Sequence, residues 1–153
     1  MKGRHEGRLL AVQFLFQRDF NVGDLDSALL LFWKIFPEIS PASKIRRFAE
    51  ELIRGVEARR DELDQRLRHY AEHWDVSRMS AVDRNVMRVA LFEMLERGDV
   101  PPVVSINEGV ELAKAFGGTS AGRFVNGILD RARRDLSRPA RRPVTEWTKE
   151  EER

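Results

Sequence analysis

The chain of 153 residues lacks cysteine, and it has only one tyrosine and three histidines. The absence of cysteine excludes disulfide bonds and thiolate metal sites, and it fits a reducing compartment. No apolar run is long enough to cross a bilayer, since the run at 9–16 is interrupted by Gln13 and leads into Arg18 and Asp19 without a small-residue cleavage site. We therefore predict a soluble, cytoplasmic protein with no membrane partner.

The sequence also lacks the alternating pattern of a sheet and any internal repeat. Apolar residues recur instead at three- and four-residue spacing, as at Ile45, Phe48, Leu52 and Val56. This pattern predicts an all-α fold, a compact bundle of about seven helices with short connections. We predict one helical domain over residues 1–136. Prolines and dense charge defeat any helical period over 137–153, which predicts a disordered tail.

Capping residues predict where the helices begin. The first helix is expected to start between Arg4 and Leu9 and to end near Asn21, and Asp24 or Asp26 can cap the second. Ser40-Pro41 predicts the start of the third helix. A break is expected in the charged stretch 57–62, and Ser80 is expected to cap an apolar, central helix.

Residues 101–130 contain the densest set of signals. Ser105 and Glu108 have the spacing of a capping box, which predicts a helix opening near Ile106. Gly117-Gly118 predicts its left-handed end, and a further helix follows, capped by Thr119 or Ser120. Phe124–Leu129 also fits an Asn-Gly hairpin, but the helical period continues to Leu136 and favours the helix. Gly109 and Gly127 inside these helices predict close packing of another backbone.

A zinc site is suggested by His69-Tyr70-Ala71-Glu72-His73, which fits an H-x-x-E-H pattern. No third histidine lies downstream on a rigid helix, so solvated surface histidines are the better interpretation. Nucleophile triads, phosphate loops and dinucleotide glycine patterns are absent. We predict no metal, no cofactor and no enzymatic activity. A hydrolase using His69 and His73 remains an alternative that zinc analysis would test.

Charge is nearly balanced, at +2, but positive charge gathers at the ends. Residues 131–143 contain six arginines against one aspartate, and the first eight residues contain Lys2, Arg4 and Arg8 with His5. Such basic segments are typical of solvated tails or of nucleic-acid contacts.

Four ordered blocks resemble the NusB transcription antitermination family. They are INEGVELAKAF (106–116), RFVNGILD (123–130), the Ser80–Glu93 segment with SAVDR and MRVALFE, and Arg8 with AVQ and LF near the start. The blocks cover most of residues 4–136. The resemblance implies two helical subbundles, the first made of the first three helices.

The resemblance also implies an antitermination factor that binds boxA-type single-stranded RNA with the ribosomal protein NusE, at the transcribing RNA polymerase, in support of rRNA synthesis. The matching RNA-binding positions are Lys2, Arg4, His5, Arg8, Arg123 and Phe124. Arginines pair with phosphates, and an exposed aromatic ring can stack on a base. Phe124 is alternatively a core residue. Glycines near the start predict an arm that orders only with RNA.

The implied NusE contacts include Phe16 and Asp83. Phe16 occupies a usual tyrosine position, and Asp83 can also serve as a helix-capping acid. Some family members form homodimers, so a homodimer is a further possible partner. NusB-like domains also precede methyltransferase domains in some enzymes, so an accessory module for rRNA modification or ribosome assembly is the alternative function. No methyltransferase segment is present in this sequence.

Overall fold

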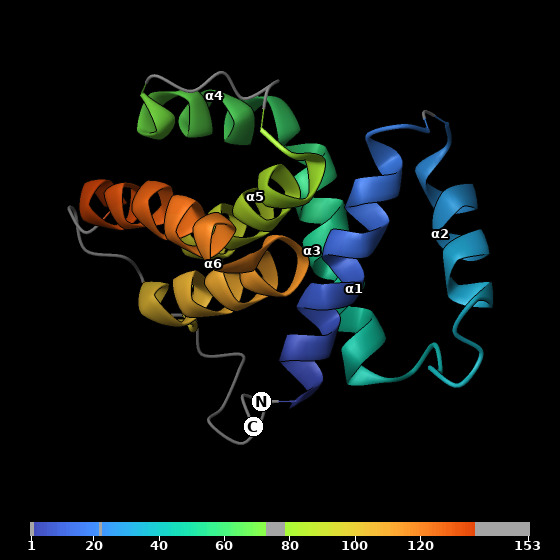
Figure 1. The fold of residues 1–153 in the computed structure, drawn as a ribbon. Helices are drawn as coiled ribbons and strands as arrows, with labels where there is room; N and C mark the ends of the chain where they lie inside the picture. Colours follow the sequence, from blue (N-terminus) through green and yellow to red (C-terminus); the bar gives the residue numbers. More distant parts are fainter. Residues whose placement is uncertain (1, 22, 73–78, 137–153) are drawn as a thin grey trace.

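The computed structural model describes residues 2–21, 23–72 and 79–136, and in these ranges it contains helices and no strand. The helices are α1 (Lys2–Arg18), α2 (Leu25–Lys34), α3 (Lys44–Ala58), α4 (Arg60–Ala71), α5 (Ala81–Glu96) and α6 (Pro102–Leu136). Figure 1 shows α1, α2 and α3 together on one side of the molecule and α4, α5 and α6 on the other. The predicted all-α fold with two subbundles is confirmed. No helix in the described ranges has the length and apolar character needed to span a membrane.

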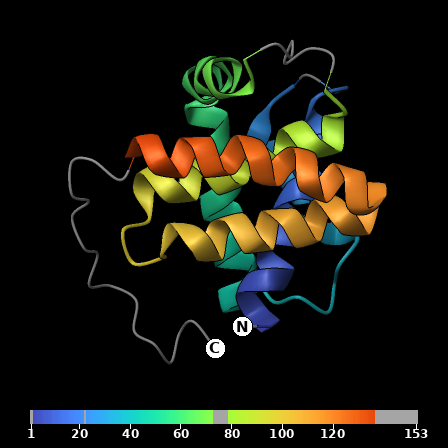
Figure 2. The same cartoon turned by 60° about the vertical axis from the view of Figure 1, so that its left-hand side comes forward.

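The last helix consists of two segments joined at Gly118. Its φ of 81° and ψ of −172° are not helical, and a positive φ favours glycine because it has no Cβ. Figure 2 shows the second segment running back alongside the first. The predicted break at the double glycine is confirmed. Counting the two segments separately also accounts for the predicted number of helices.

The start of α6 differs from the prediction. The helix begins at Pro102, which needs no backbone N–H partner in a first turn, so Ser105 lies inside the helix. Ser105 is buried, and its hydroxyl donates a hydrogen bond to Glu93 Oε1 (3.4 Å). The capping-box prediction is therefore wrong, and Glu108 instead contacts α1.

Other helix starts agree better with the sequence. Asp24 caps α2 and Ser80 caps α5, as predicted. The start of α3 is later than predicted, because Ser43 and not Ser40 accepts the backbone N–H of Arg46 (3.0 Å). The break in the charged stretch is also confirmed, since α3 ends at Ala58 and α4 begins at Arg60.

The core is built around α5, the predicted central helix, whose residues are buried from Asn85 to Met94. Glycines allow two close helix contacts. A Cβ on Gly7 would lie 2.7 Å from the Phe48 ring of α3, and one on Gly109 would lie 3.3 Å from Leu129. The atoms nearest to Gly109 belong to side chains of α5 and α6, so packing there is close but no other backbone atom is among the nearest; a Cβ on Gly127 would meet nothing within 4 Å, so the prediction is wrong at Gly127.

Candidate nucleic-acid interface

The amino-terminal segment is a helix whose arginines point inward. Arg8 donates to both Glu93 oxygens (2.9 and 2.8 Å), and the side chains of Arg8 and Glu93 are each 1% exposed. Arg8 also donates to Glu108 Oε1 (3.2 Å). Burial opposes the charge of Arg8, but Glu93 and Glu108 outweigh it and raise the pKa of Arg8. Arg8 is therefore a buried cation that joins α1 to α5 and α6.

Arg4 takes part in a second inward cluster. It donates to Asp99 Oδ2 (3.3 Å), and Arg97 donates to both oxygens of the same carboxylate (3.0 and 3.1 Å). The guanidinium groups of Arg4, Arg8 and Arg97 all lie within 6 Å of the Phe48 ring centre, a cation–π arrangement. Burial disfavours the charged carboxylate, yet Arg97 and Arg4 lower the pKa of Asp99.

The prediction of an unstructured basic arm is therefore wrong. Gly3 and Gly7 do not prevent a helix here, because close packing on α3 and the ion pairs of Arg4 and Arg8 stabilise it. His5 is more accessible than Arg4 and Arg8, since its side chain is 45% exposed. Its Nδ1 lies 3.0 Å from Glu108 Oε1. Lys2 lies in α1, and its side chain is outside the described part.

The second segment of α6 carries the other predicted RNA-binding residues. A pocket of about 240 Å³ is lined by Ala71, Glu72, Arg123, Phe124, Gly127, Ile128 and Arg131. Arg123 is exposed. Phe124 is partly buried and packs against the core, so its ring is compatible both with a role in the core and with stacking on a base. Gly127 leaves the pocket wall open at that position. The contribution of α4 to this pocket, through Ala71, was not predicted from the sequence.

Hydrogen bonds hold this pocket together. Arg131 Nη1 donates to the backbone carbonyl of Tyr70 (2.7 Å), and the Tyr70 hydroxyl donates to Asp135 Oδ2 (2.5 Å). Both bonds join the end of α4 to α6. Burial, followed by Asp135, raises the pKa of the Tyr70 phenol, which keeps it a hydrogen-bond donor at neutral pH.

The two sets of predicted RNA-binding residues do not share one pocket. In both views the first segment of α6 lies between its second segment and the amino-terminal turn of α1 (Figures 1 and 2). The structure therefore brings Arg123 and Phe124 together. His5, Arg4 and Arg8 lie on the other side of the first segment of α6. A single RNA strand that contacts both sets must run over the first segment of α6.

A second surface is an apolar groove of about 500 Å³ between α1, α2, α5 and α6. It is lined by Val12, Gln13, Phe16, Gln17, Phe32, Ile35, Phe36, Val82 and Phe116. Phe16 is 39% exposed and Phe116 is 48% exposed. Phe116 was not among the predicted protein-contact residues. Its place at the end of the first α6 segment, next to the break, leaves it open to solvent.

Asp83 lies in the first turn of α5, directly after the groove residue Val82 in the chain. Its backbone N–H donates to Ser80 Oγ (3.0 Å), which confirms Ser80 as the cap of α5. Partial burial raises the pKa of the Asp83 carboxyl, although the Ser80 hydroxyl opposes the shift. Phe16 lines the groove, whereas Asp83 follows the lining residue Val82 in the chain, and the role of both residues in a protein contact remains a prediction.

No metal site emerges from the described ranges, where no three carboxylate or histidine side chains cluster. His69 is exposed and contacts the Tyr70 ring edge-on at 5.2 Å. His73 lies outside the described residues, as does the predicted tail at 137–153.

These features define an all-helical protein with an internal arginine–carboxylate network, an arginine-lined pocket and an apolar groove. The model of the NusB family matches residues 5–134. The transcription antitermination protein NusB of Desulforapulum autotrophicum is 45% identical over 133 residues, which are 87% of this chain and 92% of that protein. The chain belongs to the NusB family.

Solved structures share the fold. NusB from T. maritima superposes with a TM-score of 0.76 at 36% identity, over 86% of this chain and 91% of that one. A chain in the crystal structure of the antitermination factors NusB and NusE with double-stranded RNA has a TM-score of 0.78 at 21% identity, over 88% and 98%. At that identity the likeness shows the fold alone.

Proposed function

We propose that this protein is a non-catalytic transcription antitermination factor of the cytoplasm. It binds boxA-type single-stranded RNA together with NusE and supports rRNA transcription by RNA polymerase. The observation that carries this proposal is family membership along nearly the whole described chain, with 45% identity to a protein named for transcription antitermination. A solved complex of the same fold contains NusE and RNA.

The pocket on α6 supports the RNA part of the proposal. Arg123 and Arg131 are exposed at its rim and offer charge to phosphates. The partly exposed Phe124 ring offers a face for an unstacked base, and Gly127 leaves room for that base to approach the helix backbone. Glu72 in the same pocket can accept a hydrogen bond from a base amino group.

The predicted contacts of Arg4 and Arg8 with RNA remain a prediction. Both side chains are at least 97% buried in ion pairs, so a phosphate contact would require those pairs to open. His5 and the first turn of α1 are better placed to meet RNA without rearrangement. We propose that Arg4 and Arg8 mainly hold α1 in place while exposed neighbours contact RNA.

The apolar groove supports the NusE part of the proposal. Exposed apolar side chains that gather in one groove mark a protein interaction site better than single exposed residues do. Phe16, Ile35 and Phe116 supply that surface. Asp83, next in the chain to the groove residue Val82, is proposed as a hydrogen-bond acceptor for the partner. A partner with an apolar segment and a nearby donor fits this groove.

The test is a titration of labelled boxA-type RNA, and of a scrambled RNA of equal composition, with and without NusE at several salt concentrations. With NusE present, boxA-type RNA should bind at least about tenfold more tightly than the scrambled RNA. Binding should weaken with salt in proportion to the number of phosphates contacted. Equal affinity for the two RNAs in the presence of NusE would contradict the proposal.

A further inference from the structure

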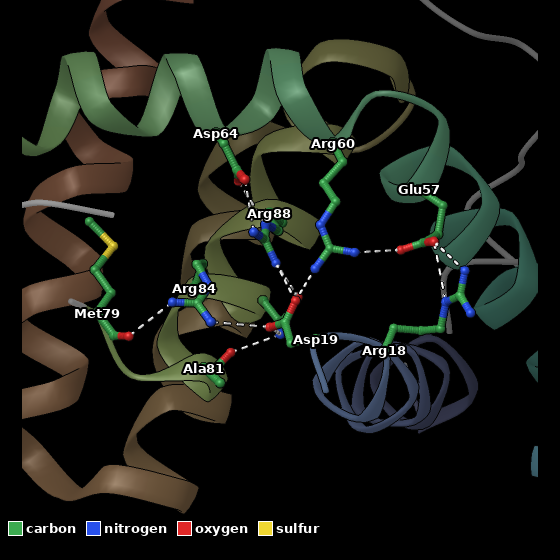
Figure 3. Close-up of polar contacts among 10 residues, drawn as sticks. Arg18, Asp19, Glu57, Arg60, Asp64, Met79, Ala81, Arg84 and Arg88 are labelled. Carbon is green, nitrogen blue, oxygen red and sulfur yellow. Dashed lines mark hydrogen bonds and ion pairs between the residues drawn. The ribbon is translucent and has the colours of Figure 1, made fainter. Parts of the chain in front are cut away.

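Asp19 lies directly after α1, and its side chain is 7% exposed. Its carboxylate accepts hydrogen bonds from three side chains of α5: Asn85 (2.8 Å), Arg88 (3.2 Å) and Arg84 (3.3 Å). It also pairs with Arg60, the first residue of α4 (Figure 3). One carboxylate from the end of α1 therefore joins α4 to α5.

A second layer of contacts surrounds this carboxylate. Arg88 makes a bidentate pair with Asp64 of α4 (2.7 and 2.8 Å), a geometry that strengthens and orients an ion pair. Arg60 donates to Glu57 at the end of α3 (2.9 Å), and Arg18 donates to the same carboxylate (3.2 Å). The network thus reaches the ends of α1, α3 and α4 (Figure 3).

Like charges face one another within this network. Arg60 of α4 and Arg84 and Arg88 of α5 converge on Asp19 (Figure 3). Burial and the charge of Arg88 lower the pKa of Arg60, and the same two causes lower the pKa of Arg84. A guanidinium group does not release its proton in proteins, so repulsion that is not neutralised must be relieved by movement. Asp19 is the carboxylate that pairs with all three of these arginines, while Glu57 and Asp64 add counter-charges to Arg60 and Arg88.

The network lies between the two candidate surfaces. Phe16, which lines the groove, lies in the last turn of α1, three residues before Asp19. On the other side, α4 continues from Asp64 to Tyr70, whose hydroxyl and carbonyl bind Asp135 and Arg131 of α6. The end of α4 also lines the pocket that contains Arg123 and Phe124.

We propose that Asp19 is a positioning residue that seats α4 against α5, and thereby shapes the pocket between α4 and α6 without touching RNA. The part of this inference that concerns RNA rests on the proposed function; the seating of α4 does not. Loss of Asp19 should leave Arg60 facing Arg84 and Arg88 with Glu57 and Asp64 as the remaining counter-charges, which moves α4 outward and weakens the pocket. The groove should keep its shape because the buried Val12 and Phe32 in its walls pack in the core.

The experiment compares wild type with Asp19→Asn by amide hydrogen exchange, RNA binding and NusE binding. We expect amides of α4 to exchange about tenfold faster relative to those of α3, and the RNA dissociation constant to rise about tenfold. The NusE dissociation constant should change less than about twofold. The double variant Asp19→Asn/Arg60→Gln should recover most of the α4 protection, because the facing charge is also removed.

The matched control is Asp26→Asn, because Asp26 pairs with Arg54 (2.7 Å) at an exposed site and should leave every readout unchanged. Unchanged exchange of α4 in Asp19→Asn, or equal loss of protection in all helices, would overturn the proposal. If only the single variant fails to fold, near wild-type α4 protection in the double variant supports it; failure of both overturns it. Wild type that binds no RNA would refute the proposed function, while exchange would still decide the seating of α4.

Discussion

Arg8→Met tests whether this arginine holds the helices together. The substitution removes three hydrogen bonds and takes the Arg8 charge away from Glu93, a carboxylate that is 1% exposed. Breaking one partner of a buried ion pair costs about 3–5 kcal/mol, because the remaining charge is uncompensated. For a chain of this size that loss lowers the melting temperature by roughly 6–20 °C.

The assay is equilibrium unfolding in denaturant at neutral pH, with the double variant Arg8→Met/Glu93→Leu beside the single one. Replacing both charges with apolar groups removes the buried carboxylate as well, so the double variant should regain most of the lost stability. His5→Ala is the control, because His5 contacts Glu108 at a half-exposed site and should cost less than about 1 kcal/mol.

Two results would refute this reasoning. A loss below about 1 kcal/mol in Arg8→Met would show that the ion pair behaves like a surface pair. The double variant could be stable and yet show a slope of log binding constant against log salt concentration that is smaller by about one. That result would show that Arg8 contacts an RNA phosphate.

Four further predictions concern single sites. Phe124→Ala should weaken RNA binding by about 1–3 kcal/mol in an anisotropy titration while circular dichroism stays helical; a large loss of helicity would show a purely structural role. Phe116→Ser should weaken NusE binding by at least about 1 kcal/mol in calorimetry without lowering the melting temperature, because the ring is half-exposed; unchanged affinity would remove it from the interface. Gly118→Ala should cost about 1 kcal/mol or more in denaturant unfolding because φ is 81°, whereas Gly23→Ala, with open space at its Cβ, should cost less than about 0.5 kcal/mol. The pKa of Asp99 in the folded protein lies below its ordinary 3.8. Its contribution to the free energy of unfolding is therefore complete well above pH 3.8 and is lost as the pH falls through the folded value. Asp99→Asn should make the free energy of unfolding depend less on pH in this acid range, as measured by denaturant unfolding at a series of pH values.

Much of the fold could be predicted from the sequence because the signals are local. Apolar spacing, the caps Asp24 and Ser80, and the double glycine each act within a few residues of the chain. The capping box predicted at Ser105 was wrong because a serine with a glutamate three residues later is also compatible with a helix interior. Its real environment, next to buried Glu93, depends on α5.

The site residues were predictable in type but not in exposure. The resemblance pointed to Arg123, Phe124, Phe16 and Asp83, and the structure places the first two in a pocket and Phe16 in a groove. It could not show that Arg8 is buried, because the glutamates that neutralise it lie 85 and 100 positions away in the chain.

Most of the helices, the break at Gly118 and the family can be inferred without coordinates. These follow from periodicity, backbone conformation and short-range hydrogen bonds. The tertiary structure alone decided which charges are paired inside and which remain for a partner. Arg4, Arg8 and Asp19 are polar in any reading of the chain, and only packing brings each of them to the opposite charges that let it be buried.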